Sequence, residues 1–112
     1  MTENGASPNT SKRQIWSASF GRSPIIGTAI HDGHLLRDDL LDTMALSDAE
    51  RLYEEDPYTG EMISGLTNRI IGQRSRFEID LNRARDAAIY LTPDQSWGLE
   101  VWRMRPSDAA IA

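Results

Sequence analysis

The stretch Ile25-Ile26-Gly27-Thr28-Ala29-Ile30-His31-Asp32-Gly33-His34 decides the fold that we expect for this chain. Residues 25–30 form a continuous apolar run of strand length, which is typical of a strand buried on both faces of a sheet. The run stops at the two histidines of the sequence, His31 and His34. In α/β proteins, ligands bind beyond the carboxyl ends of strands, so this segment predicts both a sheet and a site.

Further elements are expected on both sides of this stretch. Residues 15–20 predict a short strand, which a turn signal at residues 21–24 closes. After the histidines, apolar residues recur at helical spacing. These residues are Leu36, Leu40, Leu41 and Met44.

A second helix is expected to begin after Ser47, because Glu50 lies three residues later and completes the pattern of a capping box. Pro57 ends this helix, since the residue before proline is pushed out of the helical region. Glu54, Glu55 and Asp56 then fall at the helix end or in the following turn. The helix dipole disfavours acidic groups there, so another interaction is expected to hold them.

The second half of the chain gives weaker patterns. A short helix is expected near residues 61–68. Residues 76–81 alternate apolar and polar side chains, which predicts a half-buried strand with Phe77, Ile79 and Leu81 on one face. Residues 97–102 predict an edge strand.

Composition limits the function. The 112 residues suffice for one domain, which we place at residues 14–105, between a flexible polar arm (1–13) and an unstructured tail (106–112). The net charge of −5 argues against nucleic acid or a membrane surface as a partner. The sequence has no cysteine, which excludes disulfides and thiolate chemistry. It has no membrane-spanning run or signal peptide, so the cytoplasm is the expected location.

Three groups of residues could carry chemistry. His31 and His34 are candidate metal ligands, although two surface loop histidines would look the same. Glu55 and Asp56 are candidate carboxylate ligands, and the alternative for them is a solvated acidic helix end. Residues 82 and 83, an asparagine and an arginine, could hold a substrate carboxylate or could form ordinary surface contacts. The aromatic residues Tyr58, Tyr90, Trp97 and Trp102 are expected in a core or subunit interface.

The order of strand, histidine motif, acidic cluster and then Ser75-Arg76-Phe77-Glu78-Ile79-Asp80-Leu81-Asn82-Arg83 resembles the N-formylglutamate amidohydrolase family. The similarity spans residues 24–102. The family is similar to zinc carboxypeptidases and aspartoacylases. The resemblance implies an α/β fold, a partial mixed sheet flanked by helices, like the N-terminal half of a zinc-carboxypeptidase-like fold.

The resemblance also implies roles for the metal candidates. His31 matches the first zinc-ligand histidine, and Asp56 or Glu55 matches an acidic position that binds metal. His34 stands where the carboxypeptidases have a glutamate ligand, so it is either a substitute ligand or a group that supports the ligands.

For the substrate, Asn82 and Arg83 match the pair that holds its carboxylate. Arg76 either polarises the scissile carbonyl or supports Arg83. The implied reaction is zinc-dependent hydrolysis of the amide of an N-acyl amino acid such as N-formylglutamate, a step of histidine catabolism.

Members of this family are longer, and their C-terminal half supplies a further histidine ligand. We therefore expect a truncated chain that exposes an apolar strand edge and is marginally stable or associates, with itself or with a complementing C-terminal half. The alternative is a non-catalytic binding or assembly module derived from the family. A small α+β protein unrelated to hydrolases is the third interpretation.

Overall fold

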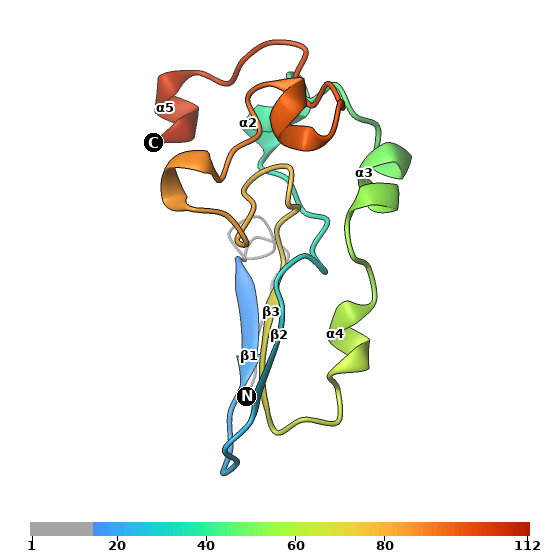
Figure 1. The fold of residues 1–112 in the computed structure, drawn as a ribbon, viewed down its shortest axis with the longest axis vertical. Coiled ribbons are helices and arrows are strands. Elements are labelled where there is room, and N and C mark those ends of the chain that lie inside the picture. The colour runs from blue at the N-terminus through green and yellow to red at the C-terminus, as the bar shows by residue number, and fades with distance from the viewer. Residues whose placement is uncertain (1–14) are drawn as a thin grey trace.

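A three-stranded mixed sheet forms one end of the molecule. The computed structural model describes residues 15–112, so the expected arm of residues 1–13 lies outside the described part. The strands are β1 (Trp16–Ser19), β2 (Ile26–Ala29) and β3 (Asn68–Gly72). They lie in the order β1-β3-β2, with β3 antiparallel to β1 and parallel to β2 (Figure 1). The expected α/β fold with a partial mixed sheet is therefore confirmed.

Short helices and loops make up the rest of the described chain. None of the described helices is long and apolar enough to cross a membrane. The α-helices are α2 (Asp38–Leu41), α3 (Asp48–Glu54), α4 (Thr59–Met62) and α5 (Asp108–Ile111), and the 3₁₀ helices are η1 (Arg85–Ala87) and η2 (Pro93–Ser96).

The capping box of α3 is present as the sequence predicts. The Ser47 side chain accepts a hydrogen bond from the backbone of Glu50, whose carboxylate accepts one from the backbone of Ser47. These contacts lower the pKa of Glu50, chiefly through the backbone N–H of Ser47. The helix ends at Glu54, three residues before Pro57. Local sequence alone therefore fixes both ends of α3.

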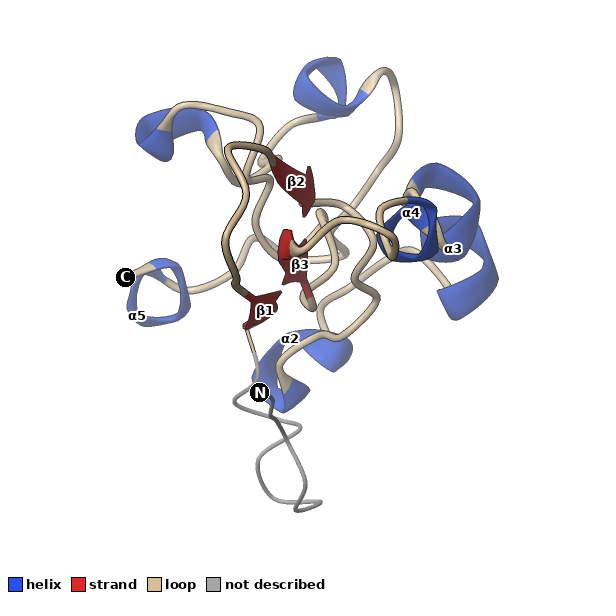
Figure 2. Ribbon diagram, turned by 90° about the horizontal axis from the view of Figure 1, so that it is seen from below, coloured by secondary structure: helices blue, strands red, loops and turns tan. Residues whose placement is uncertain are grey.

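The strand predicted at residues 25–30 exists, but the prediction that both of its faces are buried is wrong. Ile26 is 53% exposed, whereas Ala29 is buried. β2 is an edge strand, and α4 lies over the face that includes Gly27, where an added Cβ would meet the side chains of Leu66 and Ile63. On the opposite face Trp16, Ile26 and Thr28 remain exposed. Figure 2 shows the strands end-on, with α3 and α4 on one side of the sheet.

The central strand of the sheet, β3, was not predicted. The sequence predicts a weak helix near residues 61–68, which overlaps β3 only at Asn68, and it predicts no element over residues 69–72. The actual helix, α4, begins at Thr59 and ends at Met62. Asn68 then begins β3, and it binds the neighbouring loop: its amide donates to the carbonyls of Ser23 and Ile25.

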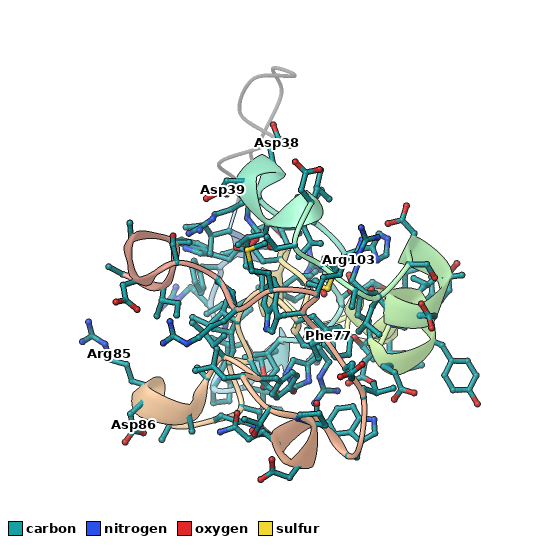
Figure 3. The ribbon with its side chains drawn as sticks, turned by 90° about the horizontal axis from the view of Figure 1, so that it is seen from above. Asp38, Asp39, Phe77, Arg85, Asp86 and Arg103 are labelled. Atoms are coloured by element: carbon teal, nitrogen blue, oxygen red, sulfur yellow. The ribbon has the colours of Figure 1, made fainter. Side chains whose placement is uncertain are left out.

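The hydrophobic core lies among the loops rather than on the sheet. Phe77 and Tyr90 are its fully buried aromatic members, and Figure 3 shows Phe77 in the interior while Arg85 and Asp86 lie at the periphery. The remaining buried members are Met44, Leu46 and Val101.

This core explains why the strand predicted at residues 76–81 is wrong. Residues 76–78 form a turn, and the burial does not alternate as a strand would require. Phe77 is buried, Ile79 and Leu81 are exposed, and the polar Asp80 is buried. A buried carboxylate needs several donors, and Asp80 has them in Arg76, the backbone of Asn82, and the distant His31 and Tyr90.

Two other expectations near the C-terminus need correction. Residues 97–102 form no strand, and Trp102 makes only an isolated bridge with Met44. The tail predicted to be unstructured contains α5, where the guanidinium of Arg37 donates to the carbonyl of Ala110. Pro106 is buried in front of this helix.

Candidate functional site

Two parallel strands bring the candidate residues to one edge of the sheet. β2 and β3 run side by side, with Ala29 opposite Ile71, so the residues that follow them emerge at the same edge. The histidine segment follows β2, and Ser75 follows β3 two residues after Gln73. This arrangement confirms that the carboxyl ends of the strands carry the polar residues.

Gly33 allows these two segments to approach closely. A Cβ atom at Gly33 would lie 2.2 Å from the carbonyl carbon of Gln73 and 2.6 Å from the backbone nitrogen of Arg74. Next to this contact, the backbone of Leu35 donates to Gln73 and accepts from Ser75. Only glycine fits here, because the obstacle is backbone that no rotamer change can move.

His31 lies between two carboxylates. Its Nε2 atom is 2.7 Å from Oδ1 of Asp80, and its Nδ1 atom is 3.5 Å from Oδ2 of Asp56. The His31 ring is buried, Asp80 is 1% exposed, and the side chain of Asp56 is 54% exposed. One side of the imidazole is therefore anchored inside the protein and the other faces the surface.

Asp80 is the buried centre of this arrangement. Its Oδ1 atom accepts from His31 and, at 2.8 Å, from the backbone N–H of Asn82. Its Oδ2 atom accepts from the hydroxyl of Tyr90 and, at 3.2 Å, from Nη2 of Arg76. Burial by itself would raise the pKa of Asp80, but the hydrogen bonds from Tyr90, Asn82 and His31 together lower it to about 2.

The ionised state of Asp80 fixes the proton on His31. A carboxylate with a pKa near 2 only accepts hydrogen bonds at neutral pH, so Nε2 of His31 carries the proton that it shares with Asp80. In the neutral imidazole, Nδ1 then holds a free lone pair. That lone pair is on the ring atom nearest to Asp56.

His34 and Glu55 form a second, separate group. Nδ1 of His34 is 2.5 Å from Oε1 of Glu55, whose other oxygen accepts from the hydroxyl of Ser75 and from Arg51 at 3.3 Å. Nε2 of His34 faces the guanidinium of Arg51 at 3.4 Å. These contacts stabilise the acidic residue at the C-terminal end of α3, which the helix dipole disfavours.

Of the four residues predicted as metal ligands, the structure thus pairs His31 with Asp56 and His34 with Glu55. In the second pair, Nδ1 of His34 and Oε1 of Glu55 bond each other, and the remaining nitrogen and oxygen contact Arg51 and Ser75. Within residues 15–112, no group of three or more His, Cys, Asp or Glu side chains is placed to hold a metal ion.

The residues predicted to bind substrate lie around Asp80. Each guanidinium nitrogen of Arg76 has a partner: Nε donates to the Tyr90 hydroxyl, Nη1 to the carbonyl of Glu54 and Nη2 to Asp80. Arg83 is less constrained. Its Nε atom is 3.7 Å from Oδ2 of Asp80 and its guanidinium lies 4.5 Å from the centre of the Tyr90 ring.

No described group bonds the Nη atoms of Arg83 or the side-chain amide of Asn82, which is exposed. Arg83 and Asn82 are therefore available to a ligand, whereas Arg76 is held in place by protein groups. The sequence left two roles open for Arg76, polarisation of the scissile carbonyl and support of Arg83. The contacts of Arg76 are with Tyr90, Glu54 and Asp80, so any support that it gives to Arg83 passes through the shared partners Asp80 and Tyr90.

One comparison with known proteins identifies the family of this chain. The family model described as N-formylglutamate amidohydrolase matches residues 23–111, which include every residue named in this site. The chain belongs to the N-formylglutamate amidohydrolase family. No curated protein and no solved structure matches the chain.

The zinc ion that membership of the N-formylglutamate amidohydrolase family suggests fits one pair of side chains. Four ligands at the usual zinc distances of about 2.0–2.1 Å stand about 3.3–3.4 Å apart at the corners of a tetrahedron. Nδ1 of His31 and Oδ2 of Asp56 are 3.5 Å apart, close to that separation. The hydrogen bond from Nε2 to Asp80 is the support that metal-binding histidines usually have.

Four residues of this candidate site were not predicted as members of it. Asp80 had been assigned to the solvent face of a strand and Tyr90 to a core or subunit interface. Arg51 and Ser75 had no assigned role. The one sequence signal for Asp80 was its place in the Asp-Leu-Asn-Arg segment, next to the residues that were chosen.

Proposed function

We propose that the chain acts as a zinc-dependent amidohydrolase of the N-formylglutamate deformylase type, which hydrolyses the amide of an N-acyl amino acid. The observation that carries this proposal is the His31–Asp80 hydrogen bond, which leaves Nδ1 of His31 free beside Asp56. Asp80 also contacts Arg83, so one buried carboxylate connects the candidate metal pair to the candidate substrate arginine.

In this proposal, His31 and Asp56 hold the zinc ion. When bound, zinc supplies Lewis acidity, which polarises a carbonyl oxygen and makes water more acidic. Asp80 keeps the His31 ring in one orientation and one tautomer. Arg76 in turn holds Asp80 in place through its hydrogen bond to Oδ2.

Arg83 and Asn82 hold the carboxylate of the substrate. The guanidinium offers two adjacent N–H groups that match a carboxylate, and the amide adds a further donor. Stacking on the Tyr90 ring fixes the direction of Arg83 before substrate arrives. Orienting the substrate in advance lowers the entropy that must be lost on the way to the transition state.

Two described donors do not complete a zinc site, and we propose that the remaining ligands come from water and from a partner. The partner is a second copy of this chain or a separate chain with the complementary half of the site. The same observation favours the alternative function, a binding or assembly module that keeps part of the family's site.

Formate release from N-formylglutamate tests the proposal. The chain is assayed with zinc over a range of protein concentrations, because a ligand from a second copy would make activity rise faster than linearly. We expect zinc-dependent formate release that is lost in His31→Ala. If the chain releases no formate at any concentration, the amidohydrolase proposal fails and the binding module is the remaining candidate.

Arg83 offers a matched test of the substrate role. Arg83→Ala should raise KM about 10- to 100-fold, since a hydrogen bond to a charged group contributes about 1.5–3 kcal/mol. Arg85→Ala is the control, because Arg85 lies in η1 at the periphery of the molecule (Figure 3). Equal KM values for the two variants would contradict the role of Arg83.

A further inference from the structure

Tyr90 lies two hydrogen bonds away from the candidate metal pair. Its hydroxyl donates to Oδ2 of Asp80, and Oδ1 of the same carboxylate accepts from Nε2 of His31. The side chain is 1% exposed. A chain of hydrogen bonds therefore runs from the core residue Tyr90 through Asp80 to the buried ring of His31, whose Nδ1 faces the exposed Asp56.

The direction of the Tyr90 hydroxyl hydrogen bond is fixed by its second partner. Nε of Arg76 donates to the Tyr90 oxygen at 3.1 Å. The hydroxyl accepts this bond, and its single proton is directed to Asp80, which as a carboxylate can only accept. The hydroxyl therefore cannot exchange its donor and acceptor roles while Arg76 is in place.

The Tyr90 ring is held from several sides. Phe77 and Trp97 contact it edge to face, with ring centres 5.6 and 5.8 Å away. Trp102 donates to its backbone carbonyl at 2.7 Å, and the guanidinium of Arg83 lies over the ring. These contacts leave the hydroxyl little freedom to move away from Asp80.

Trp97 packs against Tyr90 although its backbone adopts an unfavourable conformation. Trp97 has a φ of 42°, a left-handed conformation that costs a large residue roughly 1–2 kcal/mol. Its indole N–H donates to Oε1 of Glu54, and its ring lies 5.1 Å from the guanidinium of Arg76. The indole thus packs against both Tyr90 and Arg76, the two residues that donate to Oδ2 of Asp80.

We propose that Tyr90 is a positioning residue, which acts through Asp80 to hold His31 in the tautomer with the proton on Nε2 and the lone pair on Nδ1. Without the hydroxyl, Oδ2 of Asp80 keeps Arg76 but loses the hydrogen bond from Tyr90, and the carboxylate can rotate away from His31. The ring would then be free to adopt the other tautomer and other orientations. The role of Tyr90 in catalysis rests on the proposed function, whereas its effect on the His31 tautomer does not.

The test is the ring nitrogen NMR spectrum of His31 in the metal-free protein. The two ring nitrogens of a neutral imidazole have well-separated shifts, which report the tautomer directly. We expect the wild type to be mainly in the Nε2–H form and Tyr90→Phe to shift measurably toward a mixture. We also expect zinc affinity, measured by calorimetry, to fall up to about tenfold, the lower end of what supporting residues contribute.

Two control variants separate positioning from general stability. Tyr53→Phe makes the same chemical change at an exposed tyrosine and should leave the His31 spectrum unchanged. Phe77→Leu weakens the packing of the Tyr90 ring but leaves its hydroxyl in place. If Phe77→Leu shifts the His31 tautomer as much as Tyr90→Phe does, Tyr90 has only a structural role and the proposal is overturned.

An unchanged His31 spectrum in Tyr90→Phe also overturns the proposal. If Tyr90→Phe does not fold, 3-fluorotyrosine at position 90 keeps the ring and hydroxyl while making the hydroxyl a stronger donor. The Nε2–H form should then be at least as populated as in the wild type, and a shift the other way contradicts the inference. The spectrum needs no zinc, so an inactive chain with the expected tautomers would refute the proposed function alone.

Discussion

Nε2 of His31 and Oδ1 of Asp80 are joined by a 2.7 Å hydrogen bond between residues 49 positions apart in the sequence. Both side chains are buried, and Asp80 accepts further bonds from Tyr90, Arg76 and the backbone of Asn82. This bond gives the imidazole a defined tautomer and aims its free nitrogen toward Asp56. The candidate site therefore depends on a carboxylate that never meets solvent.

The acid stability of the metal-free protein should reflect Asp80. Its pKa is lowered to about 2 in the folded state against 3.8 in the unfolded chain. The contribution of this pKa shift to the free energy of unfolding is nearly full above about pH 4, and it is lost as the pH falls toward 2. The loss amounts to about 2 kcal/mol.

Urea unfolding at pH 6 and pH 3 checks this prediction. Asp80→Asn should be less stable at pH 6 and should lose less stability on acidification than the wild type. Asp86→Asn serves as the control because Asp86 lies exposed in η1. If acidification destabilises Asp80→Asn as much as the wild type, the lowered pKa is wrong.

Gly33→Ala should destabilise the fold at the edge where the site forms. The new methyl group would lie 2.2 Å from the carbonyl carbon of Gln73, so the histidine segment must move away from β3. Overpacking of this kind costs about 1–3 kcal/mol. We expect a melting temperature lower by roughly 4 °C or more.

Gly65→Ala is the matched control for this substitution, because an added Cβ at Gly65 meets no atom within 4 Å. Its melting temperature should stay the same or rise slightly, as the unfolded chain loses entropy. Equal melting temperatures for Gly33→Ala and Gly65→Ala would show that the close approach at Gly33 does not exist.

Ser47→Ala should lower the free energy of unfolding by about 1 kcal/mol, since it removes the N-cap of α3. The measurement is denaturant unfolding, with Ser64→Ala as the control because Ser64 is an exposed turn residue. A Ser47→Ala variant as stable as Ser64→Ala would mean that the capping box contributes nothing to stability.

The sequence predicted those parts of the fold that depend on neighbouring residues. The capping box of Ser47 and Glu50 is set by a spacing of three, and β1 and β2 by short apolar runs beside turn residues. The central strand β3 has no such pattern. It forms because β1 and β2 both pair with it, which is a tertiary effect.

The sequence predicted those members of the site whose residue type suggests chemistry, whether they are buried, as His31 is, or exposed, as Asn82 is. His31, Asp56, Asn82 and Arg83 belong to residue types that suggest chemistry by themselves. Asp80 and Tyr90 acquire a role only from the donors and acceptors that the fold places around them. Apolar and polar residues alternate at residues 76–81, which predicts a strand with Asp80 on its solvent-facing side. Such an alternation cannot distinguish a strand from a turn that buries a polar residue.

The zinc content of the purified chain after dialysis against micromolar free zinc tests the central claim most directly, with His31→Ala and His34→Ala as paired variants. The structure pairs His31 with the exposed Asp56, whereas His34 is bound to Glu55 and faces Arg51. The account predicts saturable zinc in the wild type and in His34→Ala, and its loss in His31→Ala. A wild type without zinc, or a His31→Ala variant that keeps it, would contradict the account.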